Sequence, residues 1–291
     1  MKLVLVAVVV AVALGVIAVA GSSDVRQVRN DTDRPNIISS FYPLHEFVGR
    51  IGGDKVDAIL LVPAGVEPHD WEPTVREVQQ LQASDMIVIN GAGFEAWVDG
   101  LRDGRYDGVI TDTSKGIHVR GEGAGSDPHI WLSPPNAMIQ VQNIADALSL
   151  LDSPNREYYQ TNAKKYAAEL EELDLTIREG LSECSRDFVS FHDAFSYFAD
   201  EYNLVQHSII PSTDPRIEAT ARTLQNVILL ARDLKIDVVF SEDTANSRTS
   251  EIIADEIGGT VMVLSPLEIN TGETYITVMN QNFENLRKAL C

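Results

Sequence analysis

Short apolar runs rich in β-branched residues alternate with segments of helical periodicity along most of the chain. Such runs are typical of strands buried on both faces, and helices between them connect neighbouring strands in parallel. The pattern occurs twice, before and after one long helical segment. The predicted strands are residues 37–41, 56–62, 86–90, 109–113, 188–191, 204–210, 236–241 and 260–264. We therefore expect an α/β fold with two similar four-stranded parallel-sheet lobes.

The segments between these strands are predicted to be helical. Pro134 and Pro135 directly precede one of them. The predicted helices lie near residues 43–52, 74–83, 93–102, 136–151, 194–202, 216–234, 245–257 and 273–290.

One long helix is predicted between the two groups of strands. Ser153 and Pro154 supply an N-cap and a proline at the first helical position, and residues 155–182 contain no proline and no glycine before Gly180. Apolar residues recur there at spacings of three and four, so the segment forms a rigid amphipathic helix of about 40 Å. The expected N-terminal lobe, connecting helix and C-terminal lobe are residues 36–152, 153–182 and 183–291.

The first twenty residues are typical of an export signal. Lys2 precedes an uncharged apolar run that ends in the small-residue sequence Ala18-Val19-Ala20. The run is also long enough to span a bilayer. Residues 1–20 are therefore interpreted as a cleaved signal peptide or an uncleaved N-terminal anchor, and residues 21–35 as a polar tether. In both cases we expect an extracytoplasmic protein, in the periplasm or at the outer face of the cell membrane.

The charge of the chain excludes some partners. It has 23 Lys+Arg against 43 Asp+Glu, a formal net charge of −20. Nucleic-acid binding requires a concentrated basic face, and docking on anionic lipid requires positive charge. The hydrophobic fraction of 44% indicates a folded protein with an acidic surface. We therefore expect no nucleic-acid partner.

Two histidines occur in the same unusual local sequence. Residues 67–71 and 127–131 both read acid, proline, histidine, any residue, tryptophan, and each segment follows a predicted strand. His192 ends the first predicted strand of the second lobe. Open α/β sheets bind ligands beyond the carboxyl ends of their strands, and neutral imidazoles are the commonest metal ligands. We predict that His69, His129 and His192 meet at a metal site in the cleft between the lobes.

Acidic and aromatic residues flank these histidines. Asp70, Asp127 and Asp193 lie one or two residues away, and they are either hydrogen-bond acceptors that orient the imidazoles or ordinary surface acids. Trp71 and Trp131 are interpreted as pocket walls and packing residues.

Four motifs carry a resemblance to a known family. They are residues 63–74 (PAGVEPHDWEPT), 127–134 (DPHIWLSP), 190–195 (SFHDAF) and 272–275 (GETY). With them, the chain from about residue 36 to residue 290 resembles the cluster A-I metal-binding lipoproteins, the zinc or manganese solute-binding proteins of ABC importers. The resemblance implies one metal ligand from each motif, namely His69, His129, His192 and Glu273. The fourth ligand is usually Asp in that family, and Glu242 or water is the alternative here.

The third ligand position indicates the metal. Family members that prefer manganese tend to carry Glu there, and those that prefer zinc tend to carry His, so His192 implies Zn²⁺, with Mn²⁺ as the alternative. Three imidazoles and one carboxylate also suit tetrahedral zinc. The resemblance implies a binding protein, not an enzyme, which delivers a divalent metal ion as its transported ligand to the membrane permease of an ABC importer. We expect a monomer.

Two other functions are alternatives. An exported zinc-dependent hydrolase would keep one coordination position for water, although the chain has no His-Glu-x-x-His helix and no Gly-x-Ser-x-Gly elbow. The third hypothesis is a surface adhesin of the same family.

The chain contains two cysteines, Cys184 and Cys291. In an exported protein such a pair favours a disulfide, which would join the C-terminal helix to the end of the long helix. The alternative is a pair of free thiols.

Overall fold

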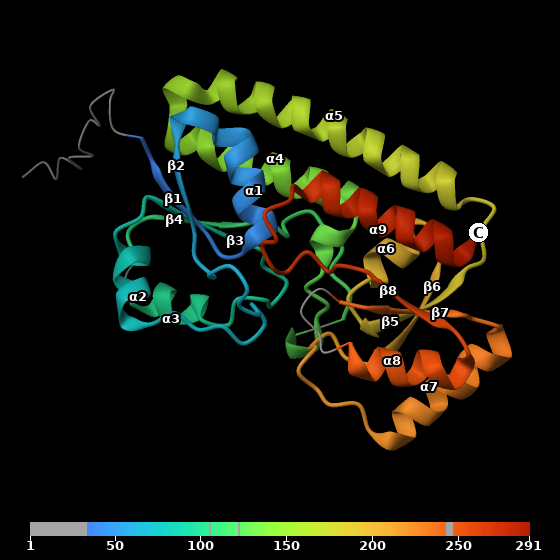
Figure 1. The fold of residues 1–291 in the computed structure, drawn as a ribbon. Helices are drawn as coiled ribbons and strands as arrows, with labels where there is room; N and C mark the ends of the chain where they lie inside the picture. The colour runs from blue at the N-terminus through green and yellow to red at the C-terminus, as the bar shows by residue number, and fades with distance from the viewer. Residues whose placement is uncertain (1–33, 105, 122, 243–246) are drawn as a thin grey trace, which may run out of the picture. The chain divides into compact units, whose positions relative to one another are not determined.

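The strands form two separate parallel sheets, as predicted (Figure 1). The computed structural model describes residues 34–291 except 105, 122 and 243–246. The first sheet has the order β2-β1-β3-β4 and the second has the order β6-β5-β7-β8. The strands are β1 (Asn36–Ser39), β2 (Asp57–Leu60), β3 (Met86–Ile89), β4 (Val109–Asp112), β5 (Asp187–His192), β6 (Val205–Ile210), β7 (Val238–Ser241) and β8 (Thr260–Val263). The expected fold class is confirmed.

The parallel register brings the carboxyl ends of the strands in each sheet to one edge. In the first sheet, Ile38 lies beside Ile59 and Ile87. In the second sheet, Val189 lies beside His207 and Val239. The segments that leave the strands at these edges are the ones that the histidine motifs occupy.

Two helices of the first half begin at a residue whose side chain caps them. The side chain of Thr74 accepts a hydrogen bond from the backbone N–H of Glu77, and the carboxylate of Glu77 accepts one from the backbone N–H of Thr74. This reciprocal pair satisfies two free donors at the start of a helix. The side chain of Ser133 caps the helix at residues 134–151 by accepting from the backbone N–H of Asn136, and prolines occupy the first two positions of that helix. The helices of the first half are α1 (Tyr42–Gly52), α2 (Val75–Gln82), α3 (Val98–Asp103) and α4 (Pro134–Leu151), with short 3-10 turns η1 (Gly53–Lys55), η2 (Gly123–Gly125) and η3 (Ile130–Leu132).

The helix predicted near 93–102 begins later, at Val98. Gly91, Ala92 and Gly93 all have positive φ angles, so the chain turns there and does not continue into a helix. The carboxylate of Glu95 holds this turn by accepting from the backbone N–H groups of Asn90 and Gly91.

The predicted connecting helix is present as α5 (Arg156–Leu181), after the 3-10 turn η4 (Ser153–Asn155). It contacts α1 and α4 beside the first sheet and α9 beside the second (Figure 1). Its buried side chains repeat every three or four residues, as the sequence predicts. They are Tyr159, Ala163, Tyr166, Leu170, Leu173, Ile177 and Leu181.

The helices of the second half are α6 (Ser196–Glu201), α7 (Ala221–Leu234), α8 (Arg248–Ile257) and α9 (Tyr275–Leu290). The helix predicted from 216 begins only at Ala221, because the side chain of Thr220 caps it by accepting from the backbone N–H of Thr223. The start predicted for α8, near residue 245, lies outside the described residues.

One apolar core lies beside both sheets. Ile37 of β1 and Phe188 of β5 belong to the same buried cluster, together with side chains of α1, α4, α5 and α9. The opposite face of the first sheet packs against α2 and α3, and that of the second against α7 and α8, each through a smaller cluster. Residues 34–291 accordingly form one compact unit. The predicted lobe boundaries stay a prediction.

The predicted disulfide between Cys184 and Cys291 is present, and it links the end of α5 to the end of α9. The predicted export segment, residues 1–20, lies outside the described residues. Within the part of the chain that the structure describes, every helix is too short or too polar to cross a membrane.

Candidate metal centre

Three loops that follow strands and the end of one strand meet between the two sheets. His69 lies in the loop after β2, and His129 lies after β4 and directly precedes η3. His192 is the last residue of β5, and Glu268 lies in the loop after β8. Each side chain therefore starts from the edge where parallel α/β sheets hold their ligands.

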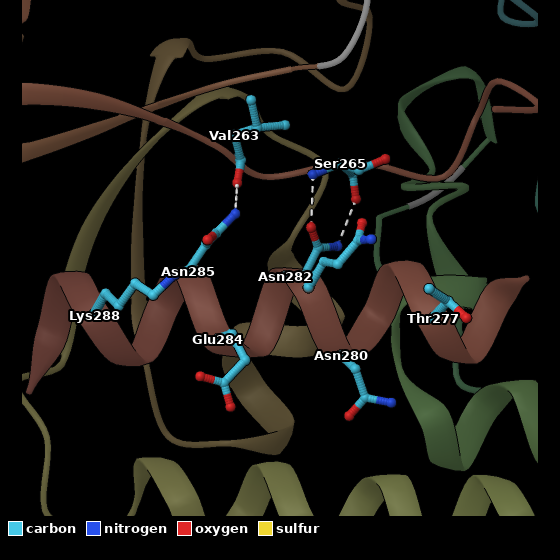
Figure 2. Close-up of a pocket in the computed structure, with 9 residues that line it drawn as sticks. Val263, Ser265, Thr277, Asn280, Asn282, Glu284, Asn285 and Lys288 are labelled. Carbon is cyan, nitrogen blue, oxygen red and sulfur yellow. Dashed lines mark hydrogen bonds between the residues drawn. The ribbon is translucent and has the colours of Figure 1, made fainter. Parts of the chain in front are cut away.

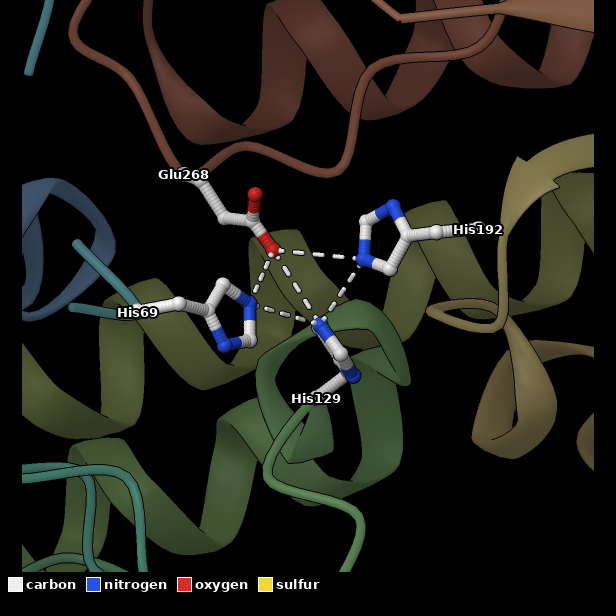
Figure 3. A group of neighbouring side chains, drawn as sticks. All are labelled: His69, His129, His192 and Glu268. Carbon is white, nitrogen blue, oxygen red and sulfur yellow. Dashed lines mark hydrogen bonds and ion pairs between the residues drawn. The ribbon is translucent and has the colours of Figure 1, made fainter. Parts of the chain in front are cut away.

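One atom from each of these residues points to a common centre (Figure 3). The Nε2 atom of His129 lies 3.3 Å from that of His69 and 3.2 Å from that of His192. Oε1 of Glu268 lies 3.0 Å from Nε2 of His69 and 3.1 Å from Nε2 of His129. All four atoms lie within 4.8 Å of one another. The predicted meeting of the three histidines is thus present in the structure.

The centre is removed from solvent and carries a carboxylate. His129 and His192 are fully buried, and Glu268 is 4% exposed. Burial raises the pKa of Glu268, but hydrogen bonds from His129 and His69 outweigh it and hold that pKa well below its usual range. Burial lowers the pKa of His129, but its bonds with Asp127 and Glu268 outweigh it and raise the pKa to about 9. The metal-free centre therefore pairs a Glu268 anion with a protonated His129.

Two carboxylates fix the orientation of the imidazoles. Oδ1 of Asp127 lies 2.8 Å from Nδ1 of His129 and also accepts from the backbone N–H of His129. Oε1 of Glu242 contacts His192 in the same two ways, through Nδ1 and the backbone N–H. A proton held on Nδ1 leaves the Nε2 lone pair of a neutral imidazole free for a metal.

Only one of the three aspartates suggested by the sequence orients a histidine. Asp127 does so. Asp70 instead pairs with Arg216 at 2.8 Å, and Asp193 lies near the hydroxyl groups of Ser196 and Ser208. The acid that orients His192 is Glu242, which directly follows β7, the strand that pairs with β5.

The two tryptophans pack as predicted. Trp131 is fully buried, and its ring lies 5.1 Å from that of His129 and 4.7 Å from that of Phe41, measured between centroids. Trp71 packs edge-to-face against Trp97. Trp131 thus forms part of the wall of the metal centre.

The structure does not bring Glu273 to the histidines. Its exposed side chain accepts a hydrogen bond from Nε2 of Gln281 at 2.9 Å, and its backbone carbonyl accepts one from the hydroxyl of Tyr42. Glu273 directly precedes Thr274, the N-cap of α9, and is held at the start of that helix. Glu268, five residues earlier, takes the fourth place. In this geometry Glu268, and not the predicted Glu273, lies with the three histidines, and Glu242 contacts Nδ1 of His192 on the side away from the group.

A signal for Glu268 was present in the sequence. It comes four residues after the predicted strand 260–264. The three histidines likewise lie at or after the carboxyl ends of predicted strands, where parallel sheets hold ligands. The family resemblance instead predicts Glu273, in the motif at residues 272–275. The position after a strand indicates Glu268 as well as Glu273, and it does not choose between them.

Comparison with known proteins places the chain in a family. Residues 37–289 match the family described as zinc-uptake complex component A, periplasmic. The chain belongs to this family. The resemblance inferred from the four motifs is therefore confirmed, and it covers both sheets and α5.

Named relatives agree with this assignment. The chain is 34% identical over 308 residues to the high-affinity zinc uptake system protein ZnuA of Bacillus subtilis, covering 97% of this chain and 96% of the relative. It is also 34% identical over 278 residues to the zinc-binding lipoprotein AdcA of Streptococcus pneumoniae, with 87% of this chain covered. The chain spans 55% of the length of AdcA.

Solved structures share the fold. The zinc-bound ZnuA-like domain of Streptococcus pneumoniae AdcA matches with a TM-score of 0.80 and 33% identity, covering 88% of this chain and 99% of that domain. The laminin-binding protein Lmb of Streptococcus agalactiae, titled a bifunctional protein with adhesin and metal transporting activity, matches with a TM-score of 0.82 and 29% identity over 88% of this chain and 99% of that one.

Proposed function

We propose that this protein captures Zn²⁺ outside the cytoplasm and delivers it to the membrane permease of an ABC importer. The observation that carries the proposal is the convergence of Nε2 of His69, His129 and His192 with Oε1 of Glu268. The B. subtilis relative is named a high-affinity zinc uptake system protein, and the S. pneumoniae relative a zinc-binding lipoprotein, which supports the proposal.

The donor set suits zinc. Three neutral imidazoles and one carboxylate make a tetrahedral nitrogen and oxygen site, whereas manganese favours more oxygen ligands. Glu268 supplies one negative charge within a buried site, which offsets part of the charge of the dication. Asp127 and Glu242 keep two of the imidazoles aligned.

Four protein donors favour capture over hydrolysis. A catalytic zinc site keeps a position open for water or substrate, whereas a site with four protein ligands is closed. The hydrolase alternative would require Glu268 to act as a base beside three histidine ligands, and the family match gives it no support. No feature of the described residues singles out an adhesive surface, so the adhesin function is not proposed here.

The proposed location rests on the chemistry of the chain. The Cys184–Cys291 disulfide is typical of oxidising compartments outside the cytoplasm. The apolar segment 1–20 would direct export, either as a cleaved signal or as a retained anchor.

The test compares two glutamates that are five residues apart. Glu268→Ala removes a proposed ligand, and we expect the zinc dissociation constant, measured by chelator competition, to rise by at least about a hundredfold. Glu273→Ala is the matched control, and its affinity should equal that of the wild type. Loss of affinity in the Glu273 variant alone would contradict the proposed ligand set.

The choice of metal is tested separately. In equilibrium competition, the wild-type protein should bind Zn²⁺ in preference to Mn²⁺ present in large excess. Retention of Mn²⁺ against equimolar Zn²⁺ would overturn the zinc assignment while leaving a metal-transport function in place.

A further inference from the structure

The loop that carries Glu268 is held from behind by helix α9. We call residues 264–268 the Glu268 loop. It begins where β8 ends, and its first backbone N–H, that of Leu264, still donates to the carbonyl of Ser241 at the end of β7. From Ser265 onward the loop leaves the sheet, so its path depends on other contacts.

Asn282 of α9 provides a reciprocal contact with Ser265 (Figure 2). Oδ1 of Asn282 accepts from the backbone N–H of Ser265 at 2.8 Å, and Nδ2 donates to the carbonyl of Ser265 at 2.7 Å. Asn282 is 2% exposed. One buried carboxamide thus satisfies both backbone groups of one residue, and removing it would leave both groups without these partners.

The backbone after Ser265 adopts an unfavourable conformation that surrounding contacts must hold. The hydroxyl of Ser265 accepts from the backbone N–H of Leu267, and Leu267 has a φ of 60°. This left-handed conformation is unfavourable for a leucine and persists only where surrounding contacts enforce it. It turns the chain so that the next residue, Glu268, faces the histidines.

Leu264 and Leu267 are buried in the main core, but packing is incomplete beside Ser265. A groove of about 550 Å³ runs between β8 and α9, and Val263, Ser265, Asn282 and Asn285 are among its lining residues. Because open space lies beside the loop there, the hydrogen bonds from Asn282 of α9 hold Ser265 in place.

We propose that Asn282 is a positioning residue that sets the Glu268 carboxylate in the metal centre through Ser265. The proposal deepens the proposed zinc function and rests on it. Among the described residues, both side-chain hydrogen bonds of Asn282 go to Ser265, and Asn282 is not a member of the metal centre, so the proposed effect runs through the Glu268 loop. Its effect on metal affinity therefore depends on the presence of the Glu268 carboxylate.

The experiment is a double-mutant cycle on the full chain with Zn²⁺ as the probe. Asn282→Leu should weaken zinc binding about tenfold, the scale seen when outer partners of metal ligands are removed. In a Glu268→Ala background, the same substitution should leave the remaining affinity unchanged. Asn285→Ala is the matched control. Asn285 lies about one turn after Asn282 in α9 and donates one hydrogen bond to the carbonyl of Val263, outside the Glu268 loop. This variant should bind zinc like the wild type.

A spectroscopic readout separates positioning from general damage to the fold. Co²⁺ substituted for Zn²⁺ should show a four-coordinate visible spectrum in the wild type and in Asn285→Ala, and an altered spectrum in Asn282→Leu. Asn282→Asp, which keeps the acceptor for the N–H of Ser265 but loses the donor, should show the same change and serves if the leucine variant does not fold.

Two results would overturn the inference. One is wild-type affinity and spectrum in both Asn282 variants, and the other is an equal loss of affinity with and without Glu268. Failure of the wild-type protein to bind zinc would instead refute the proposed function, so the two failures are distinguishable.

Discussion

Trp131 donates its indole N–H to the backbone carbonyl of Pro266 at 2.8 Å. Trp131 follows His129 by two residues, and Pro266 precedes Glu268 by two residues. The hydroxyl of Tyr275 in turn donates to the carbonyl of Trp131 at 2.6 Å. These bonds join the loops after β4 and β8 directly behind the metal centre, so they fix the spacing of two of its four members.

Replacing Trp131 with Phe should loosen this junction. The substitution leaves the carbonyl of Pro266 without its donor and removes buried ring volume, which together should lower the free energy of unfolding by about 2–4 kcal/mol. Urea denaturation of the metal-free protein measures this change. The control is Trp71→Phe, because Trp71 is partly exposed, and a change of similar size in both variants would argue against a special role for the Trp131 bond.

Removing the charge of Asp127 should weaken metal binding without removing a ligand. Asp127→Asn disturbs the partner of Nδ1 of His129, and we expect zinc affinity to fall by about 10–100-fold. Asp193→Asn is the matched control, since the side chain of Asp193 accepts from the hydroxyls of Ser196 and Ser208 and the residue follows His192 directly. Chelator competition measures both, and equal affinities in the two variants would show that the Asp127 contact does not tune the site.

Zinc binding should strengthen as the pH rises. Burial lowers the pKa of His129, but Asp127 and Glu268 raise it overall to about 9, so zinc must displace a proton from this imidazole near neutral pH. Apparent affinity should increase by about tenfold per pH unit between about pH 7 and about pH 8. Titration calorimetry in buffers of different ionisation enthalpy counts the proton released, and binding without proton release would contradict the prediction.

The same pKa predicts how the stability of the metal-free protein changes with pH. Because the folded-state pKa of His129 lies above its ordinary value of 6.5, protonated His129 contributes fully to stability below that value. The contribution is lost as the pH rises from 6.5 through about 9. Thermal denaturation across this range should show falling stability, and the fall should be smaller in His129→Gln.

Reduction of the disulfide should destabilise the fold without changing the metal centre. Cys184 and Cys291 are separated by 107 positions, and a loop of this size corresponds to roughly 4–5 kcal/mol in the chain-entropy account. Cys291 lies at the end of α9 opposite to Glu268, about 24 Å along a helix of this length. Cys184→Ser should therefore unfold at lower urea concentration and still bind zinc like the wild type at low temperature. A matching loss of zinc affinity would show that the bridge also shapes the site.

Much of the fold was predictable because it depends on local periodicity. The apolar runs of the strands and the regular spacing of Tyr159, Ala163 and Tyr166 in α5 are properties of neighbouring residues. The exceptions also have local causes. Positive φ angles at residues 91–93 delay α3, and the cap at Thr220 delays α7.

The sequence by itself determined which segments are strands and helices and which three histidines lie at strand ends. Parallel topology then brings those ends to one edge of each sheet, so His69, His129 and His192 could be selected without coordinates. Only the tertiary structure places a particular carboxylate, that of Glu268, beside them. Glu268 and Glu273 both lie between the last strand and the last helix, and their choice depends on contacts between residues far apart in sequence. Trp131 binds Pro266, Asn282 binds Ser265, and Leu267 adopts the left-handed turn that aims Glu268 at the histidines.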